Sequence, residues 1–197
     1  MIKNIILDMG RVLLSYDPDL ELKRYFDTEE DIALIRKELF RGPEWAQGDL
    51  GEITNAQRYD GVSKRVPKRL HKALRLCVDN WDECMTPLDG AREFCRYVRE
   101  KGYGVYVLSN ACQLFYEYFP RYYSLDFFDG IVVSSDIHIV KPDIRIYEYL
   151  LETYHLKAEE CLFIDDRADN IEGAQRVGMQ AEQFFGDFER IKEKYEL

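Results

Sequence analysis

Short apolar runs alternate with longer amphipathic segments along most of this 197-residue chain. Runs rich in Ile, Val, Phe and Tyr that end in small or polar residues are typical of buried β-strands. The strand-like runs are "NIILD" from Asn4, "YGVYVLS" up to Ser109, "GIVVS" up to Ser134, "CLFIDD" up to Asp166 and a less apolar one, "QAEQFF", from Gln180. Because segments with helical spacing separate them, the pattern predicts an α/β fold in which helices cover both faces of a parallel sheet.

Three segments between these runs carry helix signals. "PLDGAREFCRYVREKG" has Pro87 at its start and Gly102 just past its end, positions that suit the fixed φ of proline and the left-handed conformation of glycine. "KPDIRIYEYLLETYHL" places apolar residues such as Tyr147 and Leu150 at helical spacing, and "DNIEGAQRVGM" predicts a helix directly after an acidic pair. Each predicted helix therefore connects two predicted strands.

Between residues 14 and 86 the pattern changes, because no convincing strand occurs and helical periodicity takes over. Thr28 followed by Asp31 resembles an N-terminal capping box and predicts a helix over "EEDIALIRKELF". "TNAQRYDGVSKRV" and "PKRLHKALRLCVDNW" predict further helices. We therefore expect residues 1–13 and 87–197 to form the α/β core and residues 14–86 to be an inserted helical unit.

The balance of charge narrows the classes of partner. With 37 acidic and 27 basic side chains, the chain has a formal net charge of −10, which repels nucleic acid and anionic membranes at long range. No apolar run approaches the roughly 20 residues needed to cross a bilayer, and the N-terminus "MIKNIILD" carries an acid that signal peptides lack. Five cysteines without a CxxC pair argue against a disulfide framework or a zinc site. We expect a cytoplasmic protein without nucleic-acid or membrane partners, and the sequence leaves the oligomeric state open.

Acidic, hydroxyl and basic side chains follow the strand-like runs. In an open parallel sheet, ligands bind outside the carboxyl ends of the strands, where the loops converge. We therefore expect the polar residues after each run to gather in one crevice. In chain order they are Asp8, Ser109, Asn110, Lys141, Asp165 and Asp166.

Three carboxylates packed together repel one another unless a cation lies among them. Oxygen ligands of this kind suit Mg²⁺, which typically takes one or two carboxylates and completes its shell with water and phosphate oxygens. Ser109 and Lys141 are then placed to hold the remaining oxygens of a phosphate group. The residues therefore predict a magnesium site that binds a phosphorylated ligand.

These residues resemble, in their order, the motifs of the haloacid dehalogenase superfamily. Asp8 in "ILDMGRVL" is similar to its nucleophile motif, Ser109 in "VLSN" to the second motif, Lys141 in "VKP" to the third, and "FIDDRADNIEGAQRVGM" to the acidic fourth. The resemblance covers nearly all of the chain outside residues 14–86 and implies a Rossmann-like core. The insert looks like the family's helical cap, which closes over the active site and selects the substrate. Within it, "PEWAQGDLGEIT" resembles the element that approaches the mouth of the site.

The resemblance also implies how a metal is held and which residue is the nucleophile. Asp8 would attack phosphorus to give an aspartyl-phosphate, which water then hydrolyses. Mg²⁺ would be bound by the Asp8 carboxylate, the Gly10 backbone carbonyl and Asp166. Asp165 and Asn170 would act on the metal through waters.

The same resemblance assigns the phosphate-binding residues. Ser109, the backbone around Asn110, and Lys141 would hold the transferring phosphoryl group and offset its charge, which is the main catalytic need of this chemistry. The implied function is that of a magnesium-dependent phosphatase. Its implied substrate is a small phosphorylated metabolite.

Gly10 departs from the family's usual phosphatase pattern, Asp-x-Asp. The second aspartate protonates the leaving oxygen and later activates water, and a general acid/base of this kind is typically worth about 10²–10⁴-fold in rate. We expect either a substrate with a good leaving group, such as an anomeric sugar phosphate or an acyl phosphate, or a substitute acid such as Asp17 in "SYDPD".

Two alternatives follow from the same glycine. The first is a non-catalytic or weakly catalytic protein that binds Mg²⁺ and ligand. The second is a 2-haloacid dehalogenase, which also uses an aspartate nucleophile without the second acid but needs no Mg²⁺. The adjacent pair Asp165 and Asp166 favours a metal.

Overall fold

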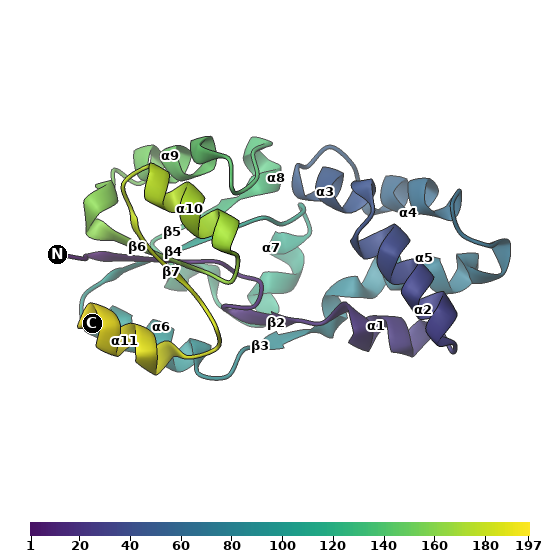
Figure 1. The fold of residues 1–197 in the computed structure, drawn as a ribbon, viewed down its shortest axis with the longest axis horizontal. Helices are drawn as coiled ribbons and strands as arrows, with labels where there is room; N and C mark the ends of the chain where they lie inside the picture. The colour runs from purple at the N-terminus through teal and green to yellow at the C-terminus, as the bar shows by residue number, and fades with distance from the viewer.

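A five-stranded parallel β-sheet forms the centre of one of the two lobes in the computed structural model, which describes residues 1–197 (Figure 1). The strand order is β5-β4-β1-β6-β7, so β1 lies in the middle and later strands are added on both of its sides. This sheet with its flanking helices confirms the predicted Rossmann-like α/β fold. The strands are β1 (Asn4–Leu7), β4 (Gly104–Ser109), β5 (Gly130–Val133), β6 (Cys161–Asp165) and β7 (Gln180–Gln183).

The sheet is buried on both faces, because successive side chains of a strand point to opposite sides. In β1, Ile5 and Leu7 belong to one hydrophobic cluster and Ile6 to another, and all three are fully buried. In the parallel register, Ile5 lies beside Val105 of β4 and Leu162 of β6. Two neighbouring strands therefore hold β1, and the residue that follows β1 has a well-defined position.

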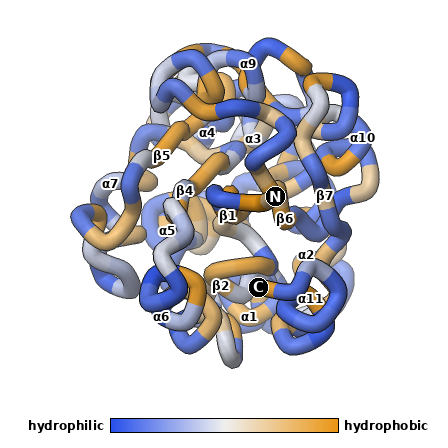
Figure 2. Tube along the Cα trace, turned by 90° about the vertical axis from the view of Figure 1, so that its left-hand side faces the viewer, coloured by the Kyte–Doolittle hydropathy of each residue, from blue (hydrophilic) through white to orange (hydrophobic).

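Helices cover both faces of the sheet. α6 and α11 pack on the face that carries Ile5 and Leu7, and α9 and α10 pack on the opposite face. Figure 2 shows apolar strands inside a more hydrophilic outer layer. These helices are α6 (Ala91–Glu100), α9 (Ile144–Thr153), α10 (Ala168–Arg176) and α11 (Phe188–Tyr195), and the shorter elements of this lobe are α7 (Phe115–Tyr118), α8 (Ser134–Ile137) and 3₁₀ turns at Phe119–Arg121, Leu125–Phe127 and Ala158–Glu160.

The second lobe is helical and has its own hydrophobic core, which includes the fully buried Leu22, Ile35 and Leu74. Because it buries apolar side chains among its own helices, this lobe is a packed body rather than a long loop. Its elements are α1 (Pro18–Tyr25), α2 (Glu29–Ile35), a π-helical turn (Arg36–Phe40), α3 (Pro43–Asp49), α4 (Asn55–Ser63), α5 (His71–Asn80) and 3₁₀ turns at Lys68–Leu70 and Trp81–Cys84.

An antiparallel ribbon joins the two lobes. β2 (Leu14–Tyr16) pairs with β3 (Met85–Pro87), so the chain enters and leaves the helical lobe at the same place. These strands correct the expectation that no strand occurs between residues 14 and 86. Each strand is only three residues long, and its partner lies far away in the sequence, so neither carries a detectable period.

The predicted helix that begins at Pro87 starts later. Pro87 is the last residue of β3, and α6 begins at Ala91 after Gly90, which has a φ of 77°. The prediction failed there because proline is also tolerated on an edge strand, where no ladder hydrogen bond needs its missing N–H. At the other end of α6, Gly102 has a φ of 88°, and the prediction of a left-handed glycine is correct.

Several local features of the helical lobe can be compared with the sequence. Thr28 accepts a hydrogen bond from the N–H of Asp31 at 3.2 Å and caps α2 as expected. The full reciprocal capping box lies instead at the start of α4, between Thr54 and Gln57.

All five cysteines of the chain are buried and unpaired. None of the helices has the length and apolar character needed to span a membrane.

Candidate active site

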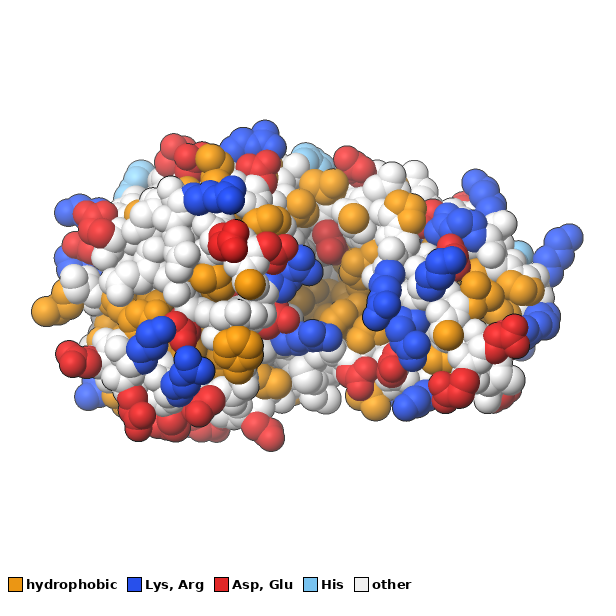
Figure 3. All heavy atoms as spheres, viewed as in Figure 1, with side chains coloured by type: hydrophobic (Ala, Val, Ile, Leu, Met, Phe, Trp, Pro, Cys, Tyr) orange, Lys and Arg blue, Asp and Glu red, His pale blue; other side chains and the backbone are white.

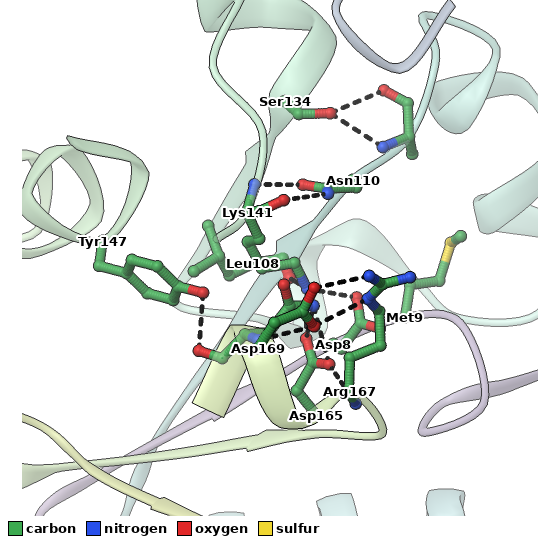
Figure 4. A network of polar contacts seen from close by, with 12 residues as sticks. Asp8, Met9, Leu108, Asn110, Ser134, Lys141, Tyr147, Asp165, Arg167 and Asp169 are labelled. Atoms are coloured by element: carbon green, nitrogen blue, oxygen red, sulfur yellow. Dashed lines mark hydrogen bonds and ion pairs between the residues drawn. The ribbon is translucent and has the colours of Figure 1, made fainter. Parts of the chain in front are cut away.

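Asp8, Ser109 and Asp165 meet at the carboxyl ends of three adjacent strands. Asp8 follows β1, Ser109 ends β4 and Asp165 ends β6, so the parallel register of the sheet brings their side chains to one edge. Lys141 reaches the same point from the loop before α9 (Figure 4). The structure therefore gathers these strand-end residues in one place.

Lys141 is a buried ammonium with three hydrogen-bond acceptors. Its Nζ donates to Asp8 Oδ1 at 2.7 Å, to Asp165 Oδ2 at 2.7 Å and to the carbonyl of Leu108 at 2.8 Å. The residue is only 4% exposed, so water does not compete for these bonds. All three N–H groups of the ammonium are thus directed by the fold.

Two asparagine side chains position the central residues of the site: Asn110 holds Lys141, and Asn170 holds Asp165. Asn110 accepts from the N–H of Lys141 at 2.8 Å and donates to its carbonyl at 3.0 Å. Asn170 donates to both oxygens of Asp165, at 2.9 and 3.0 Å, and the N–H of Arg167 donates to Asp165 Oδ1 at 2.9 Å. The Asn110 side chain is therefore engaged by the Lys141 backbone, and Asn170 bonds directly to Asp165.

The clustered charges shift one another's pKa values. Burial raises the pKa of Asp8 to about 7, while the Lys141 ammonium lowers it and the Asp165 carboxylate raises it again. Burial acts to lower the pKa of Lys141, but Asp165 and Asp8 outweigh burial and leave the pKa above its ordinary value. Burial, and then the Asp165 carboxylate, also raise the pKa of Asp166. The site thus holds more negative charge than its single buried ammonium balances.

A divalent cation fits this excess of negative charge. Asp8, Asp165 and Asp166 each offer an oxygen, and these atoms lie within 4.8 Å of one another. Opposite ligands of an octahedral Mg²⁺ are about 4.2 Å apart, because each Mg–O bond is about 2.1 Å long. Asp165 already uses both oxygens in hydrogen bonds, whereas Asp166 is half-buried and pairs only with Arg11, at 3.7 Å. Asp8 and Asp166 are therefore the more available ligands.

Ser109 and Gly10 complete the geometry near Asp8. The Oγ of Ser109 is buried and has no hydrogen-bond partner in the protein. Such a group costs about 1–3 kcal/mol unless a partner meets it, and a phosphate oxygen is a suitable acceptor. At Gly10, a Cβ atom would have no neighbour within 4 Å. A side chain at residue 10 would therefore have room, and packing does not account for the glycine.

Asp17 does not fit the role of a substitute acid. It lies on the exposed surface, and its carboxylate caps α1 by accepting a hydrogen bond from the N–H of Asp19 at 3.0 Å. Asp and Asn are strongly favoured at this position because they satisfy an unpaired helix N–H. The structure therefore gives Asp17 a role as a helix cap, which argues against the expectation that it is the substitute acid.

The helical lobe contributes polar side chains that sequence reasoning missed. Asp49, the last residue of α3, is half-buried, and its carboxylate has no hydrogen bond or ion pair. Arg58 of α4 is 1% exposed, its guanidinium lies 4.6 Å from the centre of the Trp45 ring, and its Nε has no partner. The sequence marked the segment "PEWAQGDLGEIT" that contains Asp49 but singled out neither residue, because a buried charge in a short helix has the same pattern as a solvated one.

The two lobes are packed together beside a hollow. Figure 3 shows this hollow between the lobes, with basic side chains at its rim and an acidic side chain inside. A series of aromatic rings crosses the boundary: Trp45 of the helical lobe lies 5.0 Å from Trp81, and Trp81 lies 5.5 Å from Tyr118 of α7. The helical lobe therefore has apolar support against the α/β lobe next to the site.

The family of the chain follows from a comparison with models of known protein families. The model of the haloacid dehalogenase-like hydrolases matches residues 3–178, which include every site residue described above. The chain belongs to this family. The predicted superfamily is thus confirmed, and the protein is a haloacid dehalogenase-like hydrolase.

Curated relatives of this haloacid dehalogenase-like hydrolase include fungal and bacterial proteins. It is 26% identical over 178 residues to the sesquiterpene phosphatase astK of Aspergillus oryzae, which covers 90% of this chain and 87% of the relative. It is 23% identical to the drimenol cyclase drtB of Aspergillus calidoustus, over 93% of this chain but only 34% of that longer relative. It is 30% identical to the pyrophosphatase PpaX of Bacillus cereus over 51% of this chain and 47% of the relative.

Solved structures share the fold of this haloacid dehalogenase-like hydrolase. The family enzyme bt-2542 of Bacteroides thetaiotaomicron, in complex with magnesium and inorganic phosphate, has a TM-score of 0.72 at 22% identity over 97% of this chain and 99% of that chain. The L-2-haloacid dehalogenase of Xanthobacter autotrophicus has a TM-score of 0.68 at 15% identity over 100% of this chain and 83% of that chain. At these identities the likeness shows a common fold.

Proposed function

We propose that this hydrolase is a magnesium-dependent phosphatase that releases phosphate from a small phosphorylated metabolite. The observation that carries the proposal is the environment of Asp8. One of its oxygens lies 2.7 Å from the Lys141 ammonium, and the cluster that it forms with Asp165 and Asp166 spans no more than 4.8 Å. Similarity to a sesquiterpene phosphatase and to a pyrophosphatase supports the same chemistry, as does a structural neighbour that binds magnesium and phosphate.

Asp8 is the proposed nucleophile. Lys141 engages Asp8 Oδ1, which leaves the other oxygen free to attack phosphorus and form an aspartyl-phosphate. The unpartnered hydroxyl of Ser109 and the Lys141 ammonium would hold the phosphoryl oxygens and offset their charge. Asp8, the Gly10 carbonyl and Asp166 would hold a magnesium ion, which would supply positive charge to offset that of the phosphate. Water then cleaves the aspartyl-phosphate.

We also propose that residues 14–86 act as a cap on the core formed by residues 1–13 and 87–197. The antiparallel ribbon β2–β3 is the only covalent connection between the two parts, so a change in its twist would move the helical lobe as a unit. Figure 3 shows a hollow between the lobes, and the strand ends that carry Asp8 and Asp165 point toward the helical lobe (Figure 1). This arrangement supports a small substrate, such as a sugar phosphate or another ester with a good leaving group.

Phosphate release from sugar phosphates, nucleotides and acyl phosphates, with Mg²⁺ or with EDTA, tests this function. We expect release that EDTA stops and that Asp8→Asn lowers by about 10⁴-fold or more, since the variant lacks the carboxylate that would form the acyl-phosphate bond. Asp126→Asn is the matched control, because Asp126 is exposed on a 3₁₀ turn away from the cluster.

Two results would replace the proposal. Release of halide from a 2-haloacid that continues in EDTA would assign the chain to dehalogenation. Binding of Mg²⁺ and phosphate without turnover of any ester would assign it to ligand binding. An Asp8→Asn variant with unchanged activity would remove the nucleophile from either enzyme.

A further inference from the structure

Asp49 lies where the helical lobe touches the loop after Ser109. The hydroxyl of Ser134 donates to the Asp49 carbonyl at 2.6 Å and accepts from the N–H of Ala111 at 3.0 Å. Gly51 allows this close approach, because a Cβ there would lie 2.4 Å from the carbonyl oxygen of Ser135. One buried hydroxyl therefore ties the end of α3 to the second residue beyond Ser109.

The Asp49 carboxyl group faces both lobes. Burial raises the pKa of Tyr118 well above its ordinary value, and the Asp49 carboxylate is among the neighbours that add to this rise. The same carboxylate adds to the burial that raises the pKa of Cys112, which lies in the loop after Ser109. The Tyr118 hydroxyl in turn donates to Met9 Sδ at 3.6 Å, and Met9 follows Asp8 directly. Asp49 thus lies near Tyr118, a side chain of the α/β lobe that contacts the residue after Asp8.

The geometry of phosphoryl transfer indicates where the leaving group would lie relative to Asp8 and Asp49. In phosphoryl transfer the attacking and leaving oxygens are roughly in line through phosphorus. Asp8 follows the carboxyl end of β1, and the carboxyl end of this strand points toward the helical lobe (Figure 1), so an in-line leaving oxygen would lie on the side of that lobe. Gly10 offers no proton there, whereas the helical lobe offers an unpaired carboxyl group.

We propose that Asp49 is the proton-transfer group that takes the place of the acid absent at Gly10. This inference rests on the proposed phosphatase function. In the first half-reaction the Asp8 oxygen bonds to phosphorus, the bond from phosphorus to the leaving oxygen breaks, and that oxygen takes the proton of the Asp49 carboxyl group. In the second, the Asp49 carboxylate takes a proton from water, the hydroxide oxygen bonds to phosphorus, and the bond from phosphorus to Asp8 breaks.

The titration of Asp49 is compatible with both steps near neutral pH. Burial raises its pKa to about 7, and Arg58 acts in the opposite direction. The titratable groups that face it are Tyr16 of β2, Arg58 of α4, Cys112 of the loop and Tyr118 of α7, and burial raises the pKa of both tyrosines and of the cysteine. Both the protonated and the ionised form of the Asp49 carboxyl group are therefore populated near pH 7.

The deciding experiment compares two esters in wild type and Asp49→Asn. We would measure kcat/KM, which reports the steps up to formation of the phosphoenzyme, for 4-nitrophenyl phosphate and for a primary alkyl phosphate. The alkyl ester needs a proton on its leaving oxygen, so its kcat/KM should fall by about 10²–10⁴-fold, and the nitrophenyl ester should lose less than about tenfold. Asp17→Asn is the control, since asparagine also caps a helix and both rates should stay unchanged.

Adding Gly10→Asp to Asp49→Asn provides a rescue. A side chain at residue 10 has open space, so the double variant should regain most of the kcat/KM for the alkyl ester. A structural role of Asp49 would not be rescued in this way. Equal losses on the two esters, no loss on either, or a double variant as slow as the single one on the alkyl ester would each overturn the inference.

A measurement on the wild type alone keeps the inference testable if Asp49→Asn fails to fold. The ratio of kcat/KM for the alkyl ester to that for the nitrophenyl ester should fall about tenfold per pH unit above pH 7, because the acid form of Asp49 is lost. A ratio that stays constant with pH would contradict the assignment. If the wild type hydrolyses neither ester with Mg²⁺, the proposed function itself fails; if both are hydrolysed through Asp8 and Asp49 is indifferent, only this inference fails.

Discussion

Lys141 donates a hydrogen bond of 2.7 Å to Asp8, although 133 positions separate the two residues in the chain. The same ammonium is hydrogen-bonded to Asp165, so one cation holds together two carboxylates from adjacent strands. Without the ammonium between them, the carboxylates of Asp8 and Asp165 would repel each other. The lysine thus fixes the position of Asp8, the proposed nucleophile.

Replacing Lys141 with methionine tests this role. The variant keeps the length of the side chain but leaves two buried carboxylates without their cation, and breaking a buried pair typically costs about 3–5 kcal/mol. We expect the free energy of unfolding, measured by urea denaturation in EDTA, to fall by that amount. Phosphate release in Mg²⁺ should fall by at least about 10²-fold if Lys141 is the proposed donor to the phosphoryl group.

Lys3→Met is the matched control for this prediction. Lys3 also forms an ion pair at 2.7 Å, with Glu160, but its side chain is 62% exposed. Exposed pairs contribute about 0–1 kcal/mol, so this variant should unfold almost like the wild type. Similar destabilisation in both variants would mean that the buried ion pairs of Lys141 contribute no more to stability than the exposed pair of Lys3.

The sequence supports prediction of the strands, and hence of which polar residues gather at the candidate site, for a physical reason. Asp8, Ser109 and Asp165 are found together because parallel strands in register end at one edge, and each strand is recognisable from its own apolar run. The ribbon β2–β3 was missed because its strands are stabilised by each other and not by a local pattern. Local hydrophobic periodicity therefore predicts long helices and strands, but it does not predict short strands that depend on pairing with a distant segment.

Contacts between side chains were less predictable than positions. The side-chain amide of Asn110 hydrogen-bonds to the Lys141 backbone, and the sequence "VLSN" does not predict that pairing. Asp49 lies in "PEWAQGDLGEIT", which was expected to approach the site, yet the burial of its carboxyl group depends on residues from β2, α4 and α7. Burial between two lobes is set by their packing, and one segment alone does not encode it.

Acid should weaken the helical lobe through Glu44. Arg65 donates to Glu44 Oε1 at 2.7 Å and to Oε2 at 2.6 Å, and these bonds hold the pKa of Glu44 below its ordinary value of 4.5. Because the folded-state pKa is the lower one, the stabilisation is fully present above about pH 4.5 and is lost as the pH falls through the folded-state value.

Glu44→Gln should therefore lower the free energy of unfolding at pH 7 by about 1 kcal/mol, a value reduced because Arg65 is 35% exposed. The difference from wild type should shrink as the pH falls below 4.5, which urea midpoints at several pH values would show. Glu93→Gln, in an exposed pair with Arg96, should show no such dependence. A constant difference at all pH values would exclude the ion pair as its cause.

Gly130→Ala should destabilise the edge of the sheet. A Cβ at Gly130 would lie 2.2 Å from the ring of Tyr154, whose hydroxyl bonds to the N–H of Ile131 at 2.9 Å and to its carbonyl at 3.0 Å. Displacing this ring should cost about 1–3 kcal/mol in urea unfolding. Gly10→Ala, where a Cβ meets nothing within 4 Å, should change stability by less than about 0.5 kcal/mol. Equal effects at the two glycines would show that lost backbone freedom, not the ring, decides the outcome.

Magnesium should stabilise the fold through Asp166. A ligand that binds only the native state at 100 times its dissociation constant adds about 2.7 kcal/mol, which raises the melting temperature of a domain of this size by about 5–10 °C. Asp166→Asn should abolish most of this rise, because Asp166 has an oxygen in the carboxylate cluster and no buried cation of its own. Asp169→Asn is the control, since its carboxylate is engaged with Arg167 and lies outside the cluster. Thermal unfolding of the three proteins with Mg²⁺ and with EDTA measures the effect, and an undiminished rise in Asp166→Asn would place the metal on other ligands.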